Sequence, residues 1–228
     1  MKRIEKSRKS LFASCWLFLA GLCMTGHFCY VAWRTFAAGT FGEILWITHI
    51  FTAIGGIGAL AKNRKLVSAA LVALFLNHAF WTADAVAWAF TGNFPFGFAS
   101  YLLGQDAWAF LQSANHLFDL PLLFVSALLL KGVERRSWIW SGSISAILVI
   151  ASRILVSREL NVNCAYAPWP GMDRLYPAFV LGFEGAAHVA VVIIVTVFFN
   201  HLPVNFCLFR LFEAINRKKA ADKPQVPR

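Results

Sequence analysis

Long apolar stretches alternate with short polar ones along most of this chain. Each stretch is long enough for a helix, rising 1.5 Å per residue, to cross roughly 30 Å of hydrocarbon. The pattern predicts six membrane-spanning helices over residues 11–33, 43–61, 66–88, 107–130, 138–156 and 175–200. The nearly apolar segment 89–105 gives a seven-span alternative, but its Gly, Pro and aromatic residues favour an interfacial or re-entrant element.

Composition and charge agree with this interpretation and add an orientation. Of the 228 residues, 59% are hydrophobic and 14% are charged, which excludes an ordinary soluble domain and predicts an all-α, polytopic membrane bundle. Most of the 21 lysines and arginines precede the first span, lie in loops 62–65 and 131–136, or follow the last span. The positive-inside rule then predicts cytoplasmic termini in a bacterial inner membrane. The net charge of +10 reflects topology and anionic lipid, so no nucleic-acid partner is expected.

The chain divides into one membrane domain with short basic ends. We expect a basic cytoplasmic N-terminus at 1–10, a six-span domain at 11–203, and an amphipathic segment with a basic tail at 204–228. The five cysteines show no paired metal-type spacing, and no disulfide framework is expected. No cofactor and no oligomeric state follow from the sequence.

Polar side chains inside the predicted spans are the strongest functional signal. Unpaired polar groups are costly in hydrocarbon, so they usually face the interior of a bundle and often mark function. In the six-span topology they fall in one layer between the middle of the membrane and its outer face. The members of this layer are His27, Thr48, His49, Asn77, His78, Asp84, Asn115, His116, Asp119, Arg153, Glu184 and His188.

Helical spacing assigns roles within this layer. Asp119 follows His116 by three residues and His188 follows Glu184 by four, so each pair can share a helix face. We expect His116 to be a general base oriented by Asp119, and Glu184 with His188 to be a second acid/base pair. Arg153 is expected to hold negative charge. The predicted substrate-binding residues are His49, Asn77, His78, Asp84, Asn115 and Arg153. The resulting hypothesis is a cavity that binds a membrane lipid or similar amphiphile and transfers or hydrolyses an acyl group.

Two other chemistries fit the same residues. One is a metal-dependent hydrolase with ligands drawn from His78, His116, His188, Asp84, Asp119 and Glu184, although no compact metal motif such as H-E-x-x-H is present and no metal ligand is assigned. The other is non-enzymatic, with histidines as axial haem ligands or an acid and imidazole chain that carries protons. No internal repeat favours transport.

The order of several short motifs resembles the bacterial YwaF-type membrane family, whose eukaryotic relatives are transmembrane phospholipid acyltransferases. The matching stretches are His49 within WITHIF, Phe80 with Trp81, His116, NVNCAYAPWPGM at 161–172, Tyr176 and Glu184. The resemblance implies acyl transfer and adds Asn163 to the substrate-binding residues. Two positions depart from the family, which has a cysteine where this chain has Phe51 and a tyrosine where it has Cys164. The family usually has seven spans.

Overall fold

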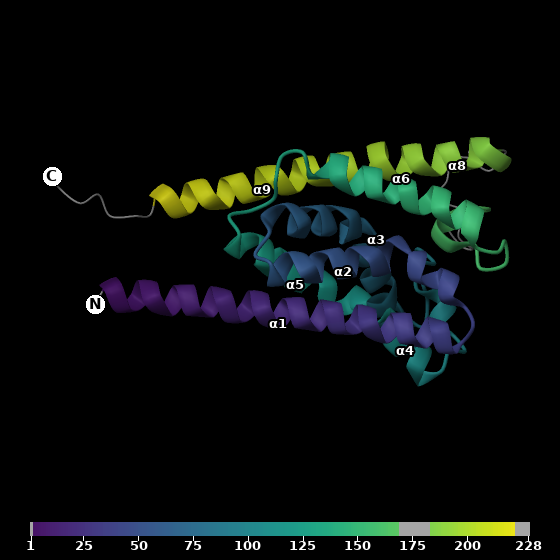
Figure 1. The fold of residues 1–228 in the computed structure, drawn as a ribbon, viewed down its shortest axis with the longest axis horizontal. Coiled ribbons are helices and arrows are strands. Elements are labelled where there is room, and N and C mark those ends of the chain that lie inside the picture. Colours follow the sequence, from purple (N-terminus) through teal and green to yellow (C-terminus); the bar gives the residue numbers. More distant parts are fainter. Residues whose placement is uncertain (1, 169–182, 222–228) are drawn as a thin grey trace.

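The computed structural model describes residues 2–168 and 183–221 of the chain (Figure 1). Every regular element in this part is helical, as predicted. The longer helices are α1 (Lys2–Ala37), α2 (Ile47–Leu60), α3 (Arg64–Thr91), α4 (Ala107–Ser113), α5 (Asn115–Leu129), α6 (Ser137–Leu155), α8 (Gly185–Ile194) and α9 (Leu202–Ala221). Short helical turns are η1 (Phe41–Leu45), η2 (Ser100–Leu102), η3 (Val162–Cys164) and the π-helical η5 (Val195–His201).

Several of these helices have the length and surface of membrane spans. Within the described residues, four are long and apolar enough to cross a membrane: Ser10–Ala37, Arg64–Thr91, Ser137–Leu155 and Gly185–Lys219. Large apolar side chains point outward from them, including Leu19, Ile147, Ile154 and Phe199, each at least 64% exposed. Such surfaces are stable in lipid and unusual in water. The fold is therefore compatible with a multi-pass membrane protein.

Three predicted spans differ from the helices observed. Segment 43–61 forms η1 and the 14-residue α2, which at 1.5 Å per residue is only about 21 Å long. Segment 107–130 is broken at Ala114 into α4 and α5. Residues 175–182 of the last prediction lie outside the described part. From Gly185 the helix then runs on to Ala221, so the amphipathic helix predicted after residue 203 is not a separate element. Residues 92–106 contain no spanning helix.

Helix α3 forms the centre of the bundle and contacts α2, α5, α6 and α9. Asn63 caps its start by accepting hydrogen bonds from the backbone N–H groups of Lys65 (3.0 Å) and Leu66 (3.2 Å). Gly92 ends it in the left-handed conformation at φ 73°. The segment Val67–Leu74 is fully or almost fully buried, which explains why it is apolar except for Ser68, whose hydroxyl accepts the backbone N–H of Glu134.

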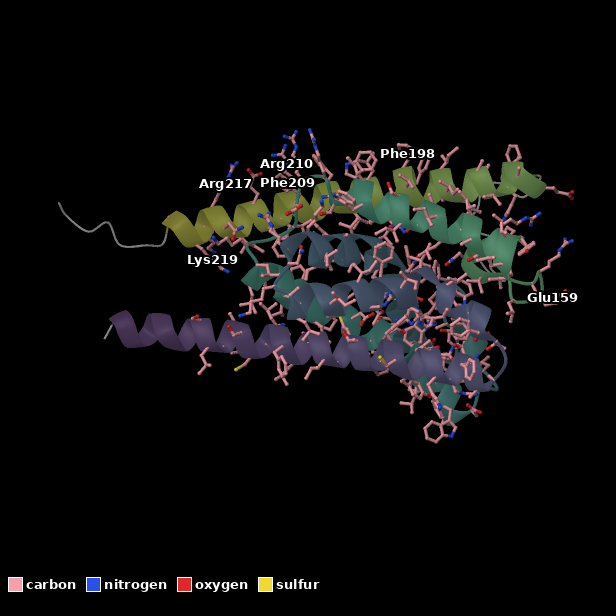
Figure 2. All side chains as sticks on the ribbon, in the orientation of Figure 1. Glu159, Phe198, Phe209, Arg210, Arg217 and Lys219 are labelled. Atoms are coloured by element: carbon pink, nitrogen blue, oxygen red, sulfur yellow. The ribbon has the colours of Figure 1, made fainter. Side chains whose placement is uncertain are left out.

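The two ends of the bundle differ in charge. Helix α1 starts and α9 finishes at the same end (Figure 1). Arg210, Arg217 and Lys219 lie along α9 toward this end, whereas Glu159 lies at the opposite end (Figure 2). Glu213 pairs with Arg217 at 2.7 Å and with Arg210 at 3.6 Å. These ion pairs are exposed and contribute little stability. The main effect of the basic side chains is therefore the positive charge that they give to the end of the bundle where α9 finishes.

Asn205 joins α9 to the loop before α6. Its side-chain oxygen accepts the backbone N–H of Trp138 at 2.7 Å, and its amide donates to the carbonyl of Glu134 at 3.1 Å. Because Asn205 is 1% exposed, these bonds satisfy polar groups that water does not reach. They fix the rotation of α9 about its axis.

Small residues let α1 and α2 cross closely. A Cβ atom added to Gly56 would lie 2.9 Å from the backbone nitrogen of Thr25 and 3.1 Å from the carbonyl oxygen of Gly21. Both distances are shorter than ordinary van der Waals contact. The helices therefore meet backbone to backbone, as small residues allow in membrane bundles.

Gly56→Ala is expected to lower the free energy of unfolding by about 1 kcal/mol, because the added methyl group pushes α1 away from α2. Gly26→Ala is a matched control on α1, since a Cβ there meets nothing within 4 Å. The control should be neutral or slightly stabilising, given the low helix propensity of glycine. Thermal unfolding in one detergent measures both variants, and equal shifts in the two would contradict the close crossing.

Candidate functional site

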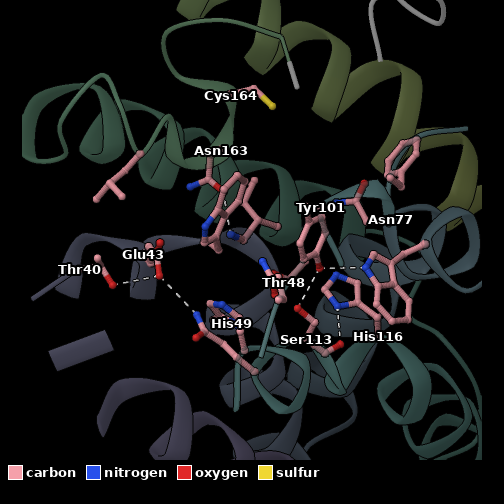
Figure 3. Close-up of a pocket in the computed structure, with 18 of the residues that line it drawn as sticks. Thr40, Glu43, Thr48, His49, Asn77, Tyr101, Ser113, His116, Asn163 and Cys164 are labelled. Atoms are coloured by element: carbon pink, nitrogen blue, oxygen red, sulfur yellow. Dashed lines mark hydrogen bonds between the residues drawn. The ribbon is translucent and has the colours of Figure 1, made fainter. Parts of the chain in front are cut away.

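A cavity of about 510 Å³ lies at the end of the bundle opposite the start of α1. It is bordered by the last turn of α1, the first turn of α2, the middle of α3, helix α4 and η5 (Figure 3). The polar residues that line it are Arg34, Thr40, Glu43, Thr48, His49, Asn77, Tyr101, Gln105, Gln112, Ser113, His116, Asn163, Thr196, Asn200 and His201. Such a concentration of polar groups between apolar helices makes this cavity the candidate functional site.

His116 reaches the cavity from a break between α4 and α5. Around Ala114 the backbone hydrogen bonds shorten to three-residue steps, from Ala114 N–H to Leu111 and from Leu117 N–H to Ala114. The carbonyl of Ser113 instead accepts a hydrogen bond from Nδ1 of His116 at 2.9 Å. A carbonyl can only accept, so Nδ1 carries the proton and Nε2 of the neutral ring keeps a lone pair. His116 thus presents a base to the site.

Two aromatic rings of α3 fix the orientation of this imidazole. The ring of His116 stacks on His78 at a centroid distance of 4.4 Å and on Trp81 at 4.8 Å. Together with the bond to Ser113, these contacts define both the position and the tautomer of His116. Such fixed geometry is what general-base catalysis requires.

A directed chain of hydrogen bonds ends at the hydroxyl of Ser113. Nε1 of Trp81 donates to the phenol oxygen of Tyr101 at 2.9 Å, and this phenol donates to Oγ of Ser113 at 2.9 Å (Figure 3). Burial raises the pKa of Tyr101, which keeps the phenol protonated. The indole can only donate, so each hydroxyl in turn passes on its own proton. No described residue accepts from Ser113, and its O–H remains a donor for a ligand.

Several buried polar atoms around the cavity have no hydrogen-bond partner among the described residues. They are Nε of Arg34, Nδ1 of His49, Oδ1 of Asn200, and both ring nitrogens of His201. Nearly all buried polar groups in proteins are hydrogen-bonded, to protein, water or ligand. Water or a polar ligand in the cavity can satisfy these atoms, which include both donors and acceptors.

The π-helical turn η5 supplies one wall of the cavity. Thr196, Asn200 and His201 come from this turn, which widens the helix locally between α8 and α9. Wide turns of this kind are rare and occur often at functional sites. The sequence interpretation missed all three, because the last predicted span ended at Asn200 and carried no sign of the turn.

Asp119 lies beneath the cavity and not beside His116. Its carboxylate contacts the hydroxyl of Thr52, Nε2 of His78 at 3.3 Å, and the amide of Asn115 at 3.5 Å. All four residues are fully buried. The predicted pairing of His116 with Asp119 is therefore replaced by the bond from His116 to Ser113. Asp119 contacts Nε2 of His78, and the ring of His78 stacks on His116.

Two residues predicted to bind substrate hold loops in place. Asp84 accepts the backbone N–H groups of Phe96 at 2.7 Å and Ala99 at 3.2 Å, which ties the loop after α3 to that helix. Asn163 accepts the N–H of Ile47 at 2.8 Å and donates to Leu45 at 2.7 Å. It thereby satisfies the first turn of α2, although part of it also lines the cavity.

The predicted pair Glu184 and His188 is separated in the structure. Glu184 is exposed at the start of α8, whereas Nε2 of the buried His188 donates to the carbonyl of Cys164 at 2.9 Å. Arg153 donates to the carbonyl of Ala165 at 3.3 Å and lies over the ring of Tyr166 at 4.2 Å. None of the three predicted residues lines the cavity. Their contacts order the segment after α6.

Most of the predicted site residues thus lie in two groups, and the others lie apart from both. His49, Asn77, His116 and Asn163 line the cavity, while His78, Asn115 and Asp119 form the buried cluster below it. Of the residues considered for the metal alternative, His78 lies beside His116 and Asp119, whereas Asp84, Glu184 and His188 lie elsewhere. Within residues 2–168 and 183–221, no three His, Cys, Asp or Glu side chains are grouped to hold a metal ion.

Sequence reasoning also missed Glu43, Tyr101 and Ser113. Glu43 accepts hydrogen bonds from Thr40 at 3.1 Å and Gln112 at 3.4 Å across the mouth of the cavity. Ser113 directly precedes the polar run that contains His116, so its place in that run was the available signal. Tyr101 lies in a loop and had no periodic pattern to mark it.

The fold and the cavity together define a class: a bundle of apolar helices around a polar site. Comparison of the chain with protein-family models, curated proteins and solved structures finds no match.

Proposed function

We propose that this protein is a membrane enzyme that binds an acyl ester of an amphiphilic lipid and transfers the acyl group to water or to another hydroxyl. One observation carries the proposal. The break between α4 and α5 places a base, Nε2 of His116, and a hydrogen-bond donor, the hydroxyl of Ser113, on the same wall of the cavity. Acyl transfer needs this pair of groups.

The roles follow from the direction of each hydrogen bond. His116 takes a proton from the attacking water or hydroxyl, whose oxygen forms a bond to the carbonyl carbon of the ester. Negative charge grows on the carbonyl oxygen, and the Ser113 hydroxyl donates to it. When the bond to the leaving alkoxide breaks, His116 returns the proton to that oxygen. No acyl-enzyme intermediate is required, which agrees with the buried Phe51 at the position where the resembled family has cysteine.

The amphiphile enters from the outer leaflet in the topology that we propose. Both termini are cytoplasmic, in the inner membrane of a bacterium, and the six predicted spans cross it with α2 short and α4–α5 broken. The basic residues of α9 support this orientation, because cytoplasmic ends carry the excess of lysine and arginine. The cavity, at the other end, then lies within reach of lipids whose headgroups face outward. The resemblance to YwaF-type proteins favours the same chemistry.

Ser113→Ala tests the donor. In vesicles of phosphatidylglycerol and phosphatidylethanolamine with a labelled acyl chain, we expect the wild-type protein to form labelled fatty acid or a newly acylated lipid. The variant should be roughly 10²-fold slower, as for the loss of one donor to a developing oxyanion. Ser145→Ala, which removes a buried serine of α6 outside the cavity, should keep the wild-type rate. No labelled product with wild-type protein, or equal rates in the two variants, would contradict the proposal.

A further inference from the structure

A second, apolar hollow lies between α3 and α5. It has a volume of about 360 Å³ and is lined by Leu71, Phe75, Leu120, Pro121, Phe124 and Val125. Pro121 is exposed at its edge, so the hollow opens on the outside of the bundle. In a membrane this side of the bundle meets lipid chains. We name this hollow the α3–α5 groove.

The α3–α5 groove and the cavity are in register along the same two helices. On α5, His116, Leu120 and Phe124 follow one another at intervals of four residues. On α3, the groove residues Leu71 and Phe75 are four residues apart, and His78 follows Phe75 by three residues. Residues at these intervals share a helix face. The stacked rings of His78 and His116 therefore lie one helical turn from the groove.

Pro121 contributes to the shape of the groove. Proline has no backbone N–H, so it cannot bond to the carbonyl of Leu117, and its ring presses against that preceding turn. A helix carrying proline bends or opens at this point. Pro121 lines the groove, so this irregularity lies where α5 faces the hollow.

The two hollows differ sharply in chemistry. Many hydrogen-bond donors and acceptors line the cavity, whereas only aliphatic and aromatic side chains and Pro121 line the groove. A molecule that occupies both has a polar part joined to a hydrocarbon chain, and its junction lies near His116, which lines the cavity one helical turn before Leu120 of the groove. In an acyl lipid that junction is the ester.

We propose that the α3–α5 groove holds the acyl chain of the lipid whose ester lies at His116. This inference rests on the proposed function, and it identifies the acyl chain as the part of the substrate whose length the protein selects. From His116 to Phe124 the groove side of α5 is about 12 Å long, at 1.5 Å per residue. A chain leaving the bilayer for the groove exchanges one apolar surrounding for another. The groove therefore selects chain length and position more than it increases affinity.

Photo-crosslinking tests the placement of the chain without needing turnover. The probe is phosphatidylglycerol with a diazirine within one acyl chain, incorporated into vesicles that contain the full-length protein. Mass spectrometry of the labelled peptides should show severalfold more label at Phe75, Leu120 and Phe124 than at Ile147 and Ile154, two lipid-facing residues of α6. Equal labelling of the two sets would overturn the inference, because every lipid-facing surface meets bilayer chains.

A second test of the inference fills the α3–α5 groove with a larger side chain. Val125→Trp, or the smaller Val125→Phe if the first variant unfolds, should reduce labelling of Phe75 and Leu120 severalfold and shift the preferred chain length downward. Ile147→Trp is the matched control and should change neither. The two proposals can fail separately. Groove labelling without any released acyl group would overturn the proposed function alone, whereas acyl release with unchanged labelling and chain preference in both Val125 variants would overturn the groove assignment alone.

Discussion

His116→Ala is expected to slow acyl transfer by roughly 10²–10⁴-fold, the usual contribution of a positioned general base. The bond from Nδ1 to the Ser113 carbonyl sets the tautomer of this imidazole, so that Nε2 is free to accept a proton. Alanine removes that base and also the ring that stacks on His78 and Trp81. Initial rates with acyl-labelled phospholipid in vesicles measure the loss.

A second variant separates the base from the hydrogen bond to Ser113. In His116→Asn the side-chain amide can still donate to the Ser113 carbonyl, but it has no basic nitrogen at the position of Nε2. It should be as slow as His116→Ala but unfold at a higher temperature than that variant, because it keeps the hydrogen bond that the break between α4 and α5 uses. His27→Ala is the control, since this histidine packs on Phe118 outside the cavity and its loss should leave the rate within a few-fold. A wild-type rate in His116→Asn would exclude His116 as the base.

Asp119→Leu is expected to lower the free energy of unfolding by about 3 kcal/mol. The carboxylate contacts Thr52, His78 and Asn115, and leucine leaves all three polar partners buried without it. Thr52 still bonds to the carbonyl of Thr48 and Asn115 still donates to Thr52, whereas His78 loses the one hydrogen bond found for it among the described residues. A buried polar group left unpaired costs roughly 1–3 kcal/mol, and the weakened bonds of the other two residues, which share the cluster, bring the loss to the upper end of this range. Asp119→Asn keeps an oxygen acceptor for Thr52 and should lose less than half as much.

Thermal or denaturant unfolding in a single detergent distinguishes these two Asp119 variants. The rate of acyl transfer adds a second measurement, because Asp119 touches His78 and His78 stacks on His116. We expect Asp119→Asn to retain most of the activity if positioning is its role. If the leucine variant proved as stable as wild type, the buried cluster would contribute no net stability to the bundle.

Helix type and much of the helix placement could be predicted from the sequence, because apolar stretches of the right length are a direct consequence of burial in lipid. The broken helix could not be predicted. No glycine or proline lies at Ala114, and the break is stabilised by a local bond from the His116 side chain to the carbonyl of Ser113, for which an apolar pattern gives no signal. Apolar composition across residues 107–130 hides such a break, since both halves remain apolar.

The polar layer was predicted more successfully than the pairs within it. The sequence placed polar residues of different spans at a similar depth, and in the structure His49, Asn77 and His116 line one cavity. Spacing along one helix did not indicate the hydrogen-bond partners of His116 and Asp119, which are three residues apart but engage different groups. Thr52 and His78 come from α2 and α3, and only the packing of these helices brings them to Asp119. Contacts between helices have no signature in the spacing along either one.

The wide turn η5 changes the rotation of side chains about the axis of the continuous helix that runs from Gly185 to Ala221. Before it, His188 is anchored to Cys164, and after it, Asn205 is anchored to Glu134 and Trp138. In a regular helix one residue corresponds to about 100° of rotation. If a single residue within Val195–His201 were deleted, the helix would rotate by this angle, and either His188 or Asn205 would no longer face its hydrogen-bond partner. The same wide turn that carries His201 to the cavity thus lets two distant attachment points of one helix be satisfied together.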